Sequence, residues 1–104
     1  MAAQWQKNVI TAVHYDVNHK RIESFHVRQY SEGKLSNPPV LYTRKQVLDL
    51  IDSGQKFVTA TPGEKKGTWS LGEEVRAITS KSGRYLRTDN NQTEADNLGD
   101  LAEF

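Results

Sequence analysis

One short helix is the strongest structural constraint in this sequence of 104 residues. Thr43 and Gln46 have the spacing of a capping box, in which each side chain accepts a hydrogen bond from the backbone N–H of the other residue. Gly54 stands where a left-handed residue ends a helix, so we predict a helix over residues 44–53. Its apolar stripe consists of Val47, Leu48 and Ile51, with Leu50 beside it. A helix of about ten residues is unstable alone in water, so it has to pack against a sheet.

Two extended segments precede this helix. Residues 8–15 and 22–30 are rich in β-branched and aromatic side chains and flank a stretch of turn formers, which predicts an antiparallel hairpin. Ile22 is out of phase with the apolar residues that follow it, so we expect a bulge near Glu23 and Ser24. In the first segment, simple alternation places Val9, Thr11, Val13 and Tyr15 on one side and Ile10, Ala12 and His14 on the other.

The second half of the chain is also extended. Residues 57–61 predict a third strand, and residues 74–80 and 84–88 predict a second hairpin around Gly83. Residues 31–40 contain two adjacent prolines and are predicted to be a loop. We therefore predict an α+β fold: a mostly antiparallel sheet of about five strands in the order β-β-α-β-β-β, with one short helix packed on it. Residues 1–104 are enough for a single domain, with an ordered core over about residues 8–101.

Composition and charge narrow the class of protein. The chain has no cysteine, which excludes disulfides, thiolate catalysis and thiolate metal sites and fits a reducing compartment. The start of the chain has no signal-like segment and no stretch is apolar enough for a membrane span, so we expect a cytoplasmic protein. Residues 1–88 carry all 14 lysines and arginines against eight acidic residues, a net charge of +6, whereas residues 89–104 carry five acidic residues and no basic one, a net charge of −5. This layout is typical of an acidic tail docked on a basic sheet, or of a nucleic-acid surface with its own competitor.

Several segments of the chain resemble one known family. They are Ile10-Thr11-Ala12-Val13, residues 47–54 leading into Phe57-Val58-Thr59, Tyr85-Leu86-Arg87-Thr88, and Asp96-Asn97-Leu98. Together they resemble a family of small, mostly bacterial domains known as domain of unknown function 3892, over about residues 9–104. Members often place a proline in the closing segment, where this chain has Leu101-Ala102-Glu103-Phe104. The resemblance implies a compact α+β unit and no known activity, cofactor or catalytic residue.

The candidate site is a polar cluster near the end of the chain, made of Tyr85, Arg87, Thr88, Asp96 and Asn97. A strand that ends in Arg87 and Thr88 can bring a guanidinium group against the Asp96 carboxylate, and Asn97 can close a turn. Two interpretations stay open. As a structural latch, the Arg87–Asp96 pair fastens the acidic terminus to the sheet. As a binding site, the same groups receive a carboxylate or phosphate from a partner.

Other motifs do not predict a metal, a cofactor or catalysis. His14, His19 and His26 lie in the first hairpin, where His14 and His26 can approach each other across the ladder, but a metal site needs a third ligand and supporting groups. Residues 63–68 resemble a phosphate loop, yet only three residues separate the glycines and a strand is predicted to follow. No nucleophile elbow or zinc-protease motif occurs. We expect no cofactor, no metal and no catalytic residue.

The sequence therefore favours a non-catalytic binding or adaptor module that presents a sheet edge or the C-terminal polar motif to a protein partner. The alternative is a nucleic-acid-binding domain that uses the basic body, residues 1–88, with the acidic terminus as competitor, because the body interleaves cations with aromatic residues. The sequence names neither the partner nor the oligomeric state.

Overall fold

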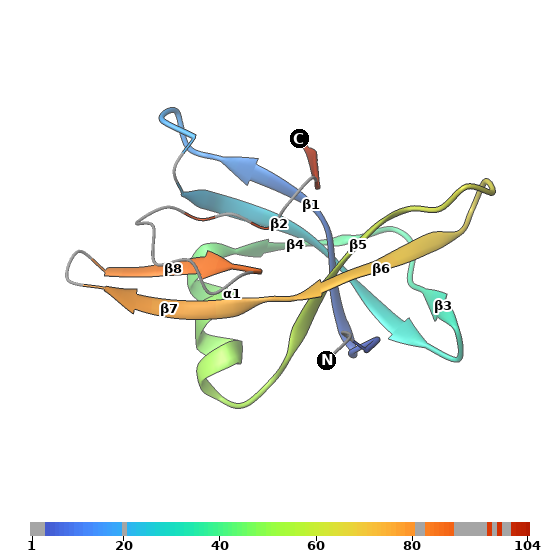
Figure 1. Ribbon diagram of the computed structural model, residues 1–104, viewed down its shortest axis with the longest axis horizontal. Coiled ribbons are helices and arrows are strands. Elements are labelled where there is room, and N and C mark those ends of the chain that lie inside the picture. Colours follow the sequence, from blue (N-terminus) through green and yellow to red (C-terminus); the bar gives the residue numbers. More distant parts are fainter. Residues whose placement is uncertain (1–3, 20, 81–82, 89–95, 97, 99–100) are drawn as a thin grey trace.

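The computed structural model describes residues 4–19, 21–80, 83–88, 96, 98 and 101–104 (Figure 1). In this part of the chain one helix, α1 (Arg44–Asp52), lies among nine strands. The strands are β1 (Asn8–Tyr15), β2 (Ile22–Ser31), β3 (Lys34–Leu35), β4 (Val40–Thr43), β5 (Phe57–Pro62), β6 (Trp69–Glu74), β7 (Arg76–Ser80), β8 (Gly83–Arg87) and β9 (Ala102–Glu103). The predicted class, strands with one short helix, is consistent with this structure.

Seven of these strands form one mixed sheet in the order β3-β2-β1-β5-β6, with β4 also paired to β2 and β9 also paired to β1. The prediction of a five-stranded, mostly antiparallel sheet was wrong, because β5 and β9 both run parallel to β1. The two predicted hairpins are confirmed, β1 with β2 and β7 with β8, but β7 and β8 form a separate two-stranded sheet. Figure 1 shows β7 continuing from β6 out of the main sheet to pair with β8.

Sequence reasoning missed four strands. β6 has six residues, whereas β3 and β9 have two each and β4 has four. β3 lies inside the segment predicted to be a loop, and β4 begins at its last residue, Val40. β3, β4 and β9 are too short to show a period of two, so only their hydrogen bonds to β1 and β2 make them strands.

Two bulges in the first hairpin decide which side chains face the core. The predicted bulge near Glu23 and Ser24 is confirmed, since Tyr15 pairs with Ile22 while its neighbour His14 pairs with Ser24. A second register shift, at Thr11, was not predicted. Each bulge inserts one extra residue and breaks the strict alternation of faces.

The predicted alternation along β1 was wrong for this reason. Val9 and Val13, expected on one side, belong to different apolar clusters, whereas Ile10 and Val13 share one. All three side chains are buried, so β1 is covered on both of its faces.

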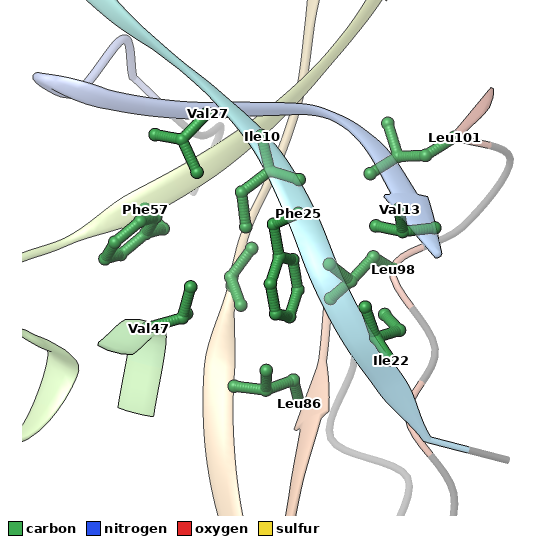
Figure 2. Close-up of a cluster of buried hydrophobic side chains, with 11 residues drawn as sticks. Ile10, Val13, Ile22, Phe25, Val27, Val47, Phe57, Leu86, Leu98 and Leu101 are labelled. Carbon is green, nitrogen blue, oxygen red and sulfur yellow. The ribbon is translucent and has the colours of Figure 1, made fainter. Parts of the chain in front are cut away.

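The main core lies between the sheet, α1 and the β7–β8 hairpin (Figure 2). Val47 from α1, Leu86 from β8 and Leu98 from the C-terminal segment surround the ring of Phe25. Along β5, Phe57 belongs to this core while its neighbour Val58 belongs to a second, smaller cluster with Val9 and Ala60. Because successive strand residues point to opposite faces, the second cluster covers the other face of the sheet.

The helix forms as its local sequence predicts. Its capping box is complete: the Gln46 N–H donates to Thr43 Oγ1 at 3.2 Å, and the Thr43 N–H donates to Gln46 Oε1 at 2.8 Å. At its other end Gly54 has φ +99°, and the N–H groups of Gly54 and Gln55 donate to the carbonyls of Ile51 and Leu50. This Schellman arrangement satisfies carbonyls that would otherwise have no partner. The helix spans nine residues and is too short and too polar to cross a membrane.

We predict that Thr43→Ala lowers the free energy of unfolding by about 1 kcal/mol, because the Gln46 N–H loses its acceptor. Urea denaturation followed by circular dichroism measures the change. Thr43→Ser is the matched control, since it keeps the hydroxyl oxygen. Equal midpoints for the alanine variant and the wild type would show that the cap contributes nothing to stability.

Candidate functional site

The Asp96 carboxylate of the predicted site binds groups from several elements of the fold. Its side chain is fully buried and accepts three strong hydrogen bonds. Oδ2 accepts from the Ile22 N–H of β2 at 2.6 Å, and Oδ1 accepts from the Leu86 N–H of β8 at 2.7 Å. Oδ2 also accepts from the guanidinium group of Arg44. One side chain thus links the main sheet, the helix and the β7–β8 hairpin.

Arg44 supplies the cation at this carboxylate from the first residue of α1. Its Nη1 donates to Asp96 and, more weakly at 3.4 Å, to the Ile22 carbonyl, while its Nη2 donates to the Arg84 carbonyl. The Arg44 side chain is only 19% exposed, so the ion pair is largely shielded from water. Such a planar fork is suited to holding a carboxylate and two carbonyls at once.

The cation that the structure shows on Asp96 is Arg44, and the latch formed by Arg87 and Asp96 stays a prediction. Arg44 and Asp96 are 52 positions apart, and no local pattern links them. A basic residue at the start of a helix is unfavourable for the helix dipole, and this was the one signal in the sequence that pointed to another role for Arg44.

The other predicted site residues lie as follows. Tyr85 and Arg87 are buried in β8, Thr88 follows at its end and is half-buried, and Asn97 lies outside the described residues. The Arg21 guanidinium lies over the Tyr85 ring, 5.6 Å from its centroid. Tyr85 and Arg87 are therefore not presented on the surface in the way that an open binding site requires.

The described residues of the C-terminal segment pack against the rest of the protein. Asp96, Leu98 and Leu101 are buried, and β9 pairs with β1. Leu98 and Leu101 contribute their side chains to the main core.

All three histidines of the chain contact the last two residues. His26 stacks on the Phe104 ring with centroids 3.8 Å apart, and His14 Nδ1 lies in hydrogen-bond contact with the Phe104 carbonyl. His19 Nε2 pairs with the Glu103 carboxylate at 2.9 Å. The His14 and His26 rings thus both lie against the Phe104 ring. Across the described part of the chain, no group of three or more histidine and acidic side chains is placed to hold a metal ion.

Four ionisable groups of the described chain have shifted pKa values, and Tyr15 and Asp52 are two of them. Burial raises the pKa of the Tyr15 hydroxyl, and the nearby Glu103 carboxylate raises it further. The two hydrogen bonds from Arg84, both 2.7 Å, lower the pKa of the exposed Asp52 carboxyl. Both effects belong to structural contacts and neither is typical of a catalytic acid or base.

The phosphate-loop-like residues 63–68 form the turn between β5 and β6. The Gly63 N–H donates to the Thr68 carbonyl at 2.8 Å, and Thr68 donates from both its N–H and its hydroxyl to the Lys65 carbonyl. Because a strand follows and these donors are used within the turn, no helix N-terminus is present to hold a phosphate.

Among the residues that the structure describes, two surfaces expose apolar side chains. The first is the outer edge of β4, where Val40 and Leu41 are 55% and 59% exposed. The second is a groove of about 430 Å³ on the face of the second cluster, lined in part by the rings of Trp5, Tyr30 and Trp69. Sequence reasoning placed Val40 in a loop and used the aromatic residues only as support for the nucleic-acid alternative, so it located neither surface.

The model of one protein family matches residues 9–102 of the chain, and that family is described as a protein of unknown function, DUF3892. No curated protein matches the chain, and no solved structure does. The match covers nearly the whole span over which the sequence resemblance was expected.

A double-mutant cycle on Arg44 and Asp96 tests the latch. We predict that Arg44→Leu and Asp96→Asn each destabilise the domain by about 3–5 kcal/mol, because each leaves a buried polar group without its partner. The double variant should lose less than the sum, with a coupling of about 0.5–3 kcal/mol. Urea denaturation measures all three variants.

The exposed Arg84–Asp52 pair is the matched control and should show a much smaller coupling, since exposed ion pairs are screened by water. A second cycle with Arg87→Leu in place of Arg44→Leu tests the pairing expected from the sequence. Stronger coupling of Asp96 to Arg87 than to Arg44 would contradict the assignment.

Proposed function

The chain belongs to the DUF3892 family, whose function is unknown, and on its own geometry we propose that it is a non-catalytic binding module that presents the β4 edge to an extended segment of a protein partner. A polypeptide in extended conformation can add to an exposed sheet edge through main-chain hydrogen bonds, while side-chain contacts provide specificity.

The observation that supports this role is the exposure of two aliphatic side chains on an open edge. β4 pairs with β2 along one side, and no other strand of the described chain pairs with its second side. Edge strands are usually protected by charged residues, bulges or a covering element. Val40 and Leu41 instead leave this edge apolar, as expected of a surface that a partner covers.

A neighbouring aromatic residue extends the apolar surface beyond the edge itself. Leu41 lies directly opposite His26 in the ladder, so their side chains share a face of the sheet. His26 in turn stacks on Phe104, whose side chain is 42% exposed. A partner strand added to β4 would therefore meet Leu41 and then the His26–Phe104 stack on one face, and Val40 on the other.

The C-terminal polar motif is less suited to this role than the sheet edge. The Asp96 carboxylate is fully buried and its contacts are internal, so a partner would have to open the core to reach it. Of the two presentation modes that the sequence suggested, the geometry favours the edge.

Nucleic-acid binding by the basic body has weaker support. Three of its cations, Arg44, Lys45 and Arg84, are engaged with carboxylates of the same chain. Deleting the acidic terminus to expose a basic surface would also remove Asp96, Leu98 and Leu101 from the interior. A cytoplasmic location remains part of the proposal and is supported by the absence of cysteine.

We predict that a photo-crosslinking amino acid at position 41 captures a protein partner in the native cell, because an added strand would contact that side chain. The matched control carries the same crosslinker at Val17, which is 99% exposed and lies outside the sheet. Mass spectrometry of the crosslinked species identifies the peptide on the partner. Leu41→Lys should weaken binding of the identified partner at least about tenfold, and Val17→Lys should not.

Two outcomes would contradict this function. One is equal capture from positions 41 and 17, which indicates non-specific contact. The other is capture that disappears after nuclease treatment, which would favour the nucleic-acid alternative.

A further inference from the structure

The groove on the second face of the sheet is formed by residues far apart in the sequence. Trp5 precedes β1, Tyr30 and Leu35 come from β2 and β3, and Trp69 begins β6. Lys34 and Thr68 add polar side chains to the lining. Figure 1 shows β3 and the β5–β6 turn at the same end of the molecule. The groove's volume of about 430 Å³ is in the range that holds a few side chains of an extended ligand.

The aromatic rings are held in place before any ligand arrives. Trp5 and Tyr30 stack almost parallel, with centroids 5.0 Å apart and planes inclined by 4°. The Arg28 guanidinium lies 5.0 Å from the centroid of Trp69, and its Nη1 donates to the Ser36 carbonyl at 2.9 Å. Rigid aromatic side chains lose little conformational entropy on binding. The groove is thus built for contact with a ligand that offers flat, apolar surfaces.

Every polar side chain of the lining can donate a hydrogen bond, and the indole and ammonium groups can only donate. The side chains that line the groove include the Lys34 ammonium and no carboxylate. Within the described chain, the indole N–H groups of Trp5 and Trp69, the Tyr30 hydroxyl and the Lys34 ammonium make no hydrogen bond. A complementary ligand therefore offers acceptors, and a negative charge near Lys34.

We propose that this groove binds a proline-rich segment of a protein partner in the polyproline II conformation. Proline has a carbonyl acceptor but no N–H donor, so such a segment matches a lining of donors. Proline rings pack on aromatic side chains, and the polyproline II conformation exists before binding, which lowers the entropic cost. An acidic residue within the segment pairs with Lys34.

Single-stranded nucleic acid fits the same rings less well. It requires a groove in which cations follow the phosphate backbone, whereas Lys34 is the single charged side chain in the lining. The two turns beside the groove carry exposed charges of both signs, Glu32 in one and Glu64, Lys65 and Lys66 in the other, rather than a continuous row of cations. The site is separate from the β4 edge, so the failure of one proposal leaves the other standing.

Nuclear magnetic resonance titration of the full chain tests this site, because the only two tryptophans both line the groove and each gives one indole N–H signal. The probe is a blocked ten-residue peptide made of two Pro-Pro-Glu-Pro-Pro units. The peptide control replaces every proline with alanine, and a ten-nucleotide oligothymidylate is the nucleic-acid probe. We expect both indole signals to shift with the proline peptide and not with either of the others.

Three variants define the contacts. Trp69→Ala should weaken peptide binding at least about tenfold, and the exposed Lys34→Glu should weaken it about threefold or more without affecting the fold. Leu41→Lys, at the β4 edge, should leave the titration unchanged. If Trp69→Ala does not fold, as judged by its amide spectrum, Lys34→Glu carries the test alone.

Any of three results overturns the proposal: no indole shift at millimolar proline peptide, equal binding of the alanine peptide, or unchanged affinity in Lys34→Glu. Tighter binding of oligothymidylate that falls steeply with salt would instead assign the groove to single-stranded nucleic acid.

Discussion

The buried carboxylate of Asp96 is the constraint on which the rest of the structure depends. It accepts backbone N–H groups from β2 and β8 and pairs with Arg44 of α1, so three elements meet at one side chain. A buried carboxylate without partners carries a free-energy penalty of several kcal/mol, whereas one with three donors positions the elements that supply them. The terminal segment is therefore part of the core, and Leu98 and Leu101 pack beside the latch.

The bulges in the first hairpin determine which side chains face the main core. By breaking the alternation of faces at Thr11, the bulge in β1 places Val13 in the same cluster as Ile10 rather than with Val9. Helix α1 and the β7–β8 hairpin cover one side. The other side has only the small cluster around Val9, and its aromatic residues stay partly exposed. The division of the sheet into a covered and an open face thus follows from strand register and from where the helix packs.

The open face connects the two candidate surfaces through β2. His26, Arg28 and Tyr30 alternate along this strand, so they share one face. His26 lies beside Leu41 and Phe104, Arg28 supports Trp69, and Tyr30 stacks on Trp5. One strand thereby supports the β4 edge with its first half and the aromatic groove with its second. Sequence reasoning found Asp96 but looked for its partner nearby, and it had no means of seeing that Trp5, Tyr30 and Trp69 meet.

Features that depend on neighbouring residues were determined by the sequence alone. The capping box of Thr43 and Gln46, the left-handed Gly54, both hairpins and the bulge at Glu23 all arise from backbone preferences and short-range hydrogen bonds. Tertiary structure decided the parallel pairing of β5 and β9 with β1, the choice of Arg44 as the partner of Asp96, and the assembly of the groove. These features join residues many positions apart. The periodicity of apolar residues predicts local structure only, and it does not indicate which strands, cations or rings become neighbours in the folded protein.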